Sequence, residues 1–169
     1  AVFDSSGEYY LNETKDSNNL YRLYVWPLNN INLTENPDVS YSLRDYGLSL
    51  WTNSNNLIIE GFKFQKHTGD SNTEGSAIVK STTNFVSDIV VRDNEIAFEN
   101  GEYAGITLFF SNNSVIENNY VHDMRGSGKG IQAGGYNITI RNNKMVNAAR
   151  TVIYFSGAVS SSIINNSVA

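Results

Sequence analysis

The segment 121–130, with the sequence VHDMRGSGKG, concentrates side chains that could do chemistry. It holds His122, Asp123, Arg125 and Lys129, together with glycines that let the chain bend. Histidine is the side-chain type that exchanges protons near neutral pH, and carboxylates or cations beside it can orient it or bind a charged substrate. The segment therefore indicates acid–base chemistry as one use for these residues.

One reaction that fits is removal of the proton beside the carboxylate of a uronic acid, as in a polysaccharide lyase. The reaction needs a base for the proton and a cation beside the carboxylate, and Lys, Arg, His and Tyr can fill those roles. The candidates for this reaction are His122, Arg125 and Lys80.

A glycoside hydrolase needs instead two carboxyl groups, about 5 Å apart in retaining enzymes and about 6.5–9.5 Å apart in inverting ones. Glu99, Glu102 and Asp123 could supply them if the fold brings them together. The third interpretation is that all these residues are solvated charges in loops, where such side chains are usually found. The sequence leaves the three alternatives open.

The composition excludes several classes of function. With a net charge of −5, the chain of 169 residues is not expected to bind nucleic acid or an anionic membrane. It lacks an apolar run of about 18 residues for membrane insertion, and without Cys it has neither disulfides nor thiolate metal sites. The 24 Asn, 19 Ser, 10 Thr, 10 Tyr and 8 Phe favour strands and turns over helices. We therefore predict an all-β protein.

The elements that must position the candidate residues appear as a repeat. The pattern apolar-x-(Asn/Asp/Gly)-Asn-x-apolar occurs at 91–96, 116–121, 140–145 and 163–168, with a variant at 59–64. Its second Asn stands at Asn94, Asn119, Asn143 and Asn166, so the period is 25, 24 and 23 residues. Short apolar strands precede the pattern at 47–50, 77–80, 105–108, 130–133 and 152–155. This period, with loops of varying length, is typical of a solenoid.

We predict a right-handed parallel β-helix of about five coils over residues 40–169, preceded by a short β-hairpin-like lead-in over residues 1–39. Coils would stack about 4.8 Å apart. The residues expected to stack inside are Ile59, Val91, Ile116 and Ile140. The four Asn would form an internal ladder, because Asn tolerates left-handed backbone at a tight corner and bonds neighbouring amides. Phe62 takes the same position on the earlier coil.

With this repeat and ladder, residues 40–169 resemble the right-handed parallel β-helix superfamily, whose best-known members are pectate lyases and related polysaccharide enzymes. The Arg-x-Pro-x-x-Arg signature of pectate lyases is absent. The Asn-Thr-Asp, Asp-Asp and Gly-His-Gly motifs of polygalacturonases are absent as well. The resemblance therefore implies the fold and a polysaccharide ligand, and it disfavours those two reactions.

The first residues are similar to a lead-in of large secreted β-helix proteins that act on glycans. The similarity rests on EYYLN at 8–12, LYVWP at 23–27 and SLRDYG at 42–47. It implies strands near Tyr9–Leu11 and Leu23–Trp26, with an irregular loop over Asn29–Asp38. Such a lead-in combined with Asn-rich coils is also similar to an archaeal cell-surface disaggregatase-like group.

In this fold the first sheet and the loops before it usually form the substrate groove, since loops carry groups that the rigid coils position. The expected substrate-binding residues are Trp51, Tyr103, Lys129, Gln132 and Tyr154. The segment 70–75, DSNTEG, imitates the first half of a calcium loop, but Ser81 stands where the loop needs Glu. We therefore expect a turn there and no cofactor, with calcium as the alternative.

The predicted function is that of an extracellular or cell-surface protein that binds polysaccharide along its first sheet and cleaves it by β-elimination or hydrolysis. The alternative is a non-catalytic adhesion or carbohydrate-binding module. The start at Ala1 and the stop just after the strand-like segment 162–169 suggest a piece of a longer chain. We expect its last coil to associate end to end with another copy, because an uncapped coil offers unpaired backbone groups.

Overall fold

The computed structural model describes residues 9–12, 22–25, 46–50, 54–67, 76–80, 84–99, 104–125, 128–148 and 150–169. The chain divides into two units, Ala1–Tyr41 and Ser42–Ala169. Every named element in these residues is a β-strand. No helix that could cross a membrane is found in the described part of the chain.

In the first unit, β1 (Tyr9–Asn12) and β2 (Arg22–Val25) form an antiparallel pair. The hairpin-like lead-in is therefore confirmed. The irregular loop predicted over Asn29–Asp38 lies outside the described residues.

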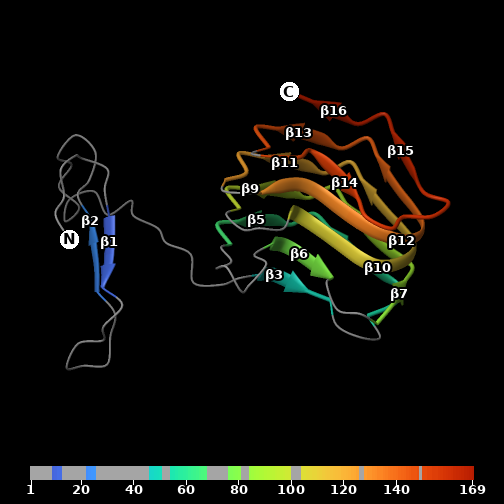
Figure 1. The fold of residues 1–169 in the computed structure, drawn as a ribbon, viewed down its shortest axis with the longest axis horizontal. Helices are drawn as coiled ribbons and strands as arrows, with labels where there is room; N and C mark the ends of the chain where they lie inside the picture. Colours follow the sequence, from blue (N-terminus) through green and yellow to red (C-terminus); the bar gives the residue numbers. More distant parts are fainter. Residues whose placement is uncertain are drawn as a thin grey trace. The chain divides into compact units, whose positions relative to one another are not determined.

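The second unit is a solenoid whose coils pass in turn through three faces of parallel strands (Figure 1). The strands that form the first face are β3 (Tyr46–Ser49), β6 (Ser76–Lys80), β10 (Ala104–Glu117), β12 (Lys129–Arg141) and β14 (Ile153–Phe155). The second face adds β4 (Leu57–Glu60), β7 (Val86–Ser87), β8 (Ile89–Arg92) and β15 (Ser162–Ile164). The third face consists of β5 (Lys63–Gln65), β9 (Glu95–Ala97), β11 (Tyr120–His122), β13 (Lys144–Val146) and β16 (Ser167–Val168).

Each strand pairs in parallel with the strand of the next coil, as the order β5-β9-β11-β13-β16 in the third face illustrates. The long strands β10 and β12 bend and serve both the first and the second face. β10 pairs with β6 through Ile106–Leu108 and with β8 through Val115–Glu117. This topology is a parallel β-helix, as the repeat predicted.

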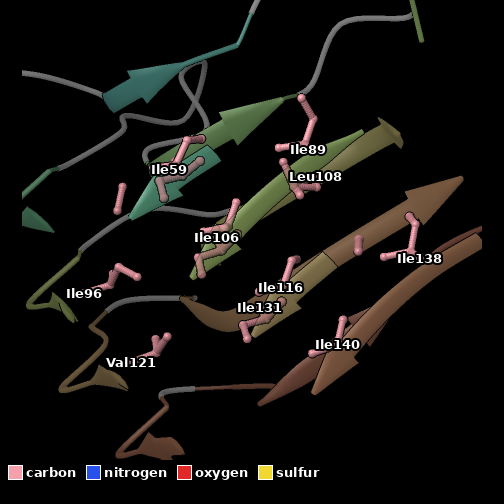
Figure 2. Packing of buried hydrophobic residues seen from close by; sticks show 14 of the residues in the cluster. Ile59, Ile89, Ile96, Ile106, Leu108, Ile116, Val121, Ile131, Ile138 and Ile140 are labelled. Atoms are coloured by element: carbon pink, nitrogen blue, oxygen red, sulfur yellow. The ribbon is translucent and has the colours of Figure 1, made fainter. Parts of the chain in front are cut away.

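The core lies inside the coils, where like residues stack in register. Ile59 pairs with Val91, Val91 with Ile116, and Ile116 with Ile140, and all four side chains are buried. The predicted stack is therefore confirmed (Figure 2). No coil could bury this apolar column alone, so stacking stabilises every coil through its neighbours.

The Asn ladder is also confirmed. The backbone N–H of Asn94 donates to Oδ1 of Asn119 at 3.1 Å, and its side-chain amide donates to the same oxygen at 3.0 Å. Asn119 repeats both bonds to Asn143, and Asn143 repeats them to Asn166. On the earlier coil the N–H of Phe62 donates to Oδ1 of Asn94 at 3.0 Å. The ladder satisfies backbone groups that would otherwise be buried without a partner.

The corners correct one detail of the prediction. The left-handed conformation belongs to the residue before each ladder Asn, namely Gly61, Asp93, Asn118, Asn142 and Asn165. The ladder Asn follows this corner residue, and its side chain bonds inside the solenoid. Further left-handed columns turn the chain at the other two corners, formed by Asn56, Asp88, Asn113, Asn137 and Ser160, and by Lys66, Phe98, Asp123 and Asn147.

Candidate functional site

His122 lies on the outer side of the third face, because β11 alternates exposed Tyr120, buried Val121 and half-buried His122. Its Nδ1 is 2.7 Å from Oδ2 of Asp123, and its Nε2 is 3.4 Å from Oε1 of Glu95. The imidazole stacks on the Tyr120 ring with centroids 4.2 Å apart. Sequence analysis singled out His122 and Asp123 and missed Glu95, which precedes His122 by 27 residues and meets it only through coil stacking.

The carboxylates around His122 have depressed pKa values. The pKa of Asp123 is lowered first by the hydrogen bond from Asn147 Nδ2 at 2.9 Å and next by His122. The pKa of Glu95 is lowered chiefly by its hydrogen bond with Lys63 Nζ at 2.8 Å. Both carboxylates are therefore anionic acceptors at neutral pH, which suits a role in holding the imidazole rather than in donating a proton.

The cations near this histidine have aromatic partners. The guanidinium of Arg125 lies 5.6 Å from the centroid of Phe98, whose ring meets His122 edge-on at 6.0 Å. Nζ of Lys144 lies 5.1 Å from the centroid of Tyr120. We call His122, Asp123, Glu95, Tyr120, Phe98, Arg125, Lys63 and Lys144 the third-face cluster. A histidine with a carboxylate at each ring nitrogen donates to both only when protonated, so this arrangement leaves no free lone pair for general-base work.

Glu99 lies elsewhere, at the corner that follows β9, and it is buried to 1% exposure. Its carboxylate oxygens are both 3.0 Å from Nδ1 of His67, and Oε2 accepts the backbone N–H of His67 at 3.1 Å. Burial raises the pKa of Glu99, and the hydrogen bond with His67 opposes that shift only in part. The pairing of Glu99 with Asp123 expected of a hydrolase does not form, because Glu99 bonds His67 while Asp123 bonds His122 and Asn147.

The remaining predicted catalytic residues do not join the third-face cluster within the described structure. The backbone of Lys80 belongs to β6 on the first face, where it pairs with Leu108. The Lys80 side chain and all of Glu102 lie outside the described residues. So do Trp51, Tyr103, the calcium-like segment 70–75 and Ser81. In the part of the chain that is described, no group of three or more His, Asp or Glu is placed to hold a metal ion.

The predicted substrate-binding residues on the first face differ in accessibility. Gln132 pairs in register with Thr107 and Tyr154, yet its side chain is only 2% exposed, and Thr107 is fully buried. The expectation that these two face an open groove is wrong, because here the sheet is buried on both sides. Tyr154 is exposed, and Nζ of Lys129 lies 5.7 Å from its ring centroid. Lys129 and Tyr154 therefore remain accessible candidates, and they contact each other.

An open groove of about 450 Å³ lies where the first face turns into the second. Its lining, the aromatic groove of this article, consists of Phe85, Phe109, Phe110, Gly134, Gly135, Ser156 and Gly157. Phe85 and Phe110 are exposed by 57% and 37% and meet edge to face, with centroids 5.6 Å apart and planes at 89°. Exposed aromatic rings beside a glycine floor are typical of a binding surface.

The glycine floor follows from the close approach of neighbouring coils. A Cβ at Gly134 would collide with the carbonyl oxygen of Ser156, and a Cβ at Gly135 would collide with that of Ser111. Gly135 also has a φ of 140°, which side chains rarely adopt. The sequence included Phe109 and Phe110 among aromatic residues able to stack on sugars. It missed Phe85, whose signal is its place one coil before Phe110, and His67, which follows Phe62 as Glu99 follows Asn94, by five residues.

The family comparison agrees with this architecture. The model of the right-handed β-helix region matches residues 23–169, and the chain therefore belongs to the right-handed β-helix family. No curated protein and no solved structure matched the chain. The family defines the fold and its handedness. The finer resemblances to pectate lyases and to disaggregatase-like proteins stay predictions.

Proposed function

We propose that this chain is an extracellular β-helix module that binds polysaccharide in the aromatic groove. The observation that carries the proposal is the pair Phe85 and Phe110, two large apolar side chains held at the surface above a floor of glycine backbone. A folded protein gains by burying such rings, so their joint exposure indicates a partner that covers them.

A sugar ring fits the chemistry of this groove. One face of a pyranose carries C–H groups that can pack on a phenyl ring, and its rim carries hydroxyls. The glycine floor and Ser156 present backbone groups and a hydroxyl that can bond those hydroxyls. The groove also crosses successive coils, so a polymer can lie along the solenoid axis and contact several of them.

The contacts of the candidate catalytic residues support binding without cleavage. His122 faces carboxylates through both ring nitrogens, and Glu99 is buried against His67. A lyase needs a free base beside a free cation, and a hydrolase needs two carboxyl groups around one glycosidic bond. The described residues supply neither arrangement, which favours the carbohydrate-binding alternative over β-elimination or hydrolysis.

Binding of a panel of neutral and acidic polysaccharides tests the proposal. We expect at least one glycan to bind the intact chain, and Phe85→Ala or Phe110→Ala to abolish binding while the β-sheet circular dichroism stays unchanged. Phe62→Ala is the matched control, because Phe62 is also exposed and also packs on a second ring, that of Phe64, at another corner. Binding that survives both groove variants would refute the proposal.

The same panel tests cleavage. We expect neither new reducing ends nor the ultraviolet absorbance of unsaturated uronates. Reducing ends with that absorbance would establish a lyase, and reducing ends alone would establish a hydrolase. Either result would replace the binding module with an enzyme.

A further inference from the structure

We propose that the aromatic groove selects uncharged glycans and rejects glycans that carry carboxylates. This inference rests on the proposed function and adds the chemical class of the ligand. None of the seven described residues that line the groove carries a charge: they are three Phe, three Gly and one Ser. The chain as a whole has a net charge of −5.

The first argument concerns desolvation. A uronic acid bound against Phe85 and Phe110 must give up water around its carboxylate, and the lining offers no cation in exchange. Burying an ionised group without a partner costs far more than burying a hydroxyl that finds a backbone acceptor or donor. A neutral sugar loses little at this surface, whereas a uronate loses a large part of the binding free energy.

The second argument concerns where the cations of the described structure lie. Lys63, Lys144 and Arg125 belong to the third-face cluster, and each already has a carboxylate or aromatic partner. Arg92 and Arg141 bond Glu60 and Glu117 on the second face. None of these five cations is among the residues that line the groove. The excess negative charge of the chain adds a long-range repulsion of polyanions that salt screens.

The third argument concerns length. The lining residues come from four successive coils: Phe85 precedes β7, Phe110 lies in β10, Gly134 lies in β12 and Ser156 follows β14. Four coils span three spacings, or about 14 Å along the axis. This length accommodates a short run of linked sugars, so a substituent on every ring would meet the apolar lining repeatedly. Discrimination against a uniformly charged polymer is therefore stronger than against a single charged sugar.

Two ligand pairs that differ mainly in charge test the inference by calorimetric titration of the intact chain. One pair is cellohexaose and cellohexaose oxidised to carboxylate at C6. The other is hexagalacturonate as the full methyl ester and as the free acid. Each ligand is titrated at low and at high salt, with the wild type, Phe85→Ala and the control Phe62→Ala.

We expect the neutral member of a binding pair to bind about tenfold or more tightly than its acid, at both salt concentrations. Phe85→Ala should abolish that binding and Phe62→Ala should not. A preference that vanishes at high salt would assign it to net charge rather than to the groove and would overturn the inference. Equal or tighter binding of the acid, lost in Phe85→Ala, would also overturn it while the proposed function stands. Failure of all four ligands and of the polysaccharide panel to show binding that depends on Phe85 would overturn both.

Discussion

Glu99 and His67 form a buried acid–histidine pair inside the solenoid, with the carboxylate 3.0 Å from Nδ1 of the imidazole. Both residues follow a left-handed corner residue, Phe98 and Lys66, which turns the next side chain toward the interior. The following coil places Met124 at the equivalent position, and Met124 is buried. A carboxylate therefore occupies a place that the repeat otherwise gives to an apolar residue.

This pair predicts how stability changes with pH. Because burial raises the folded-state pKa of Glu99, the protonated form favours the folded state, so the contribution is fully present below the ordinary glutamate pKa. The contribution is lost as pH rises through the raised pKa. We expect Glu99→Gln to flatten the dependence of the melting temperature on pH above that of an unperturbed glutamate. A variant whose profile matches the wild type would contradict this.

Removing the acceptor is a separate test of the same pair. Glu99→Ala leaves the backbone N–H of His67 without its partner, and we expect a loss of about 1–3 kcal/mol in the free energy of unfolding. Glu99→Gln keeps an acceptor oxygen and should lose less. Urea unfolding at neutral pH measures both variants, and equal losses would show that the hydrogen bond to His67 contributes nothing.

Asp123 predicts the opposite sign. Its pKa is depressed, chiefly by Asn147 and next by His122, so its contribution is present above the ordinary aspartate pKa and is lost as pH falls through the lowered value. We expect Asp123→Asn to remove part of the acid sensitivity of the wild type. Thermal unfolding from neutral to acid pH checks this, with Asn147→Ala as the variant that should reproduce half of the effect or more. An unchanged acid limb in both variants would contradict the role of these hydrogen bonds.

The Asn ladder predicts a gradient of stability along the solenoid. Asn119→Ala removes an acceptor used twice by Asn94 and a donor to Val91 and Asn143, all of them buried groups. We expect a loss of about 3 kcal/mol or more, since each unsatisfied buried group costs about 1–3 kcal/mol. Asn166→Ala at the last rung should lose less. Similar losses at both positions, measured by urea unfolding, would show that the ladder does not act cooperatively.

The glycines of the aromatic groove differ in what a methyl group would meet. At Gly135 a Cβ would collide with the backbone of Ser111, whereas at Gly157 nothing lies within 4 Å. We expect Gly157→Ala to cost about 1–2 kcal/mol for its positive φ alone. Gly135→Ala should cost more and should also weaken glycan binding. Thermal unfolding of the two variants decides the order, and a milder effect at Gly135 would contradict the close coil contact.

The last coil carries the prediction of self-association. Its strands β15 and β16 expose Ile163, Ile164 and Val168 by half or more. We expect end-to-end association of the chain to increase with concentration and to disappear in Ile164→Lys, because the lysine brings charge into an apolar contact. Sedimentation velocity measures this, with Ile58→Lys on β4 as the control. A wild type that stays monomeric at high concentration would refute the prediction.

The sequence by itself determined the solenoid. A period of 23 to 25 residues places like residues above one another, and the free energy of burying Ile and satisfying Asn requires that register whatever the loops do. The ladder, the inward stack at Ile116 and the hairpin strands could therefore be predicted. The left-handed residue could not be assigned between the two members of each Asn pair, because both residue types tolerate that conformation.

Only the tertiary structure decided which candidate residues meet. His122 and Glu95, Glu99 and His67, and Phe85 and Phe110 lie on different coils, and their contacts depend on corner geometry that reverses which side of the sheet a residue occupies. One left-handed residue at Phe98 moves Glu99 from the outer surface to the interior. Periodicity in sequence reports which residues repeat, whereas the side of the sheet is set by a local backbone choice that polar residues near a corner leave open.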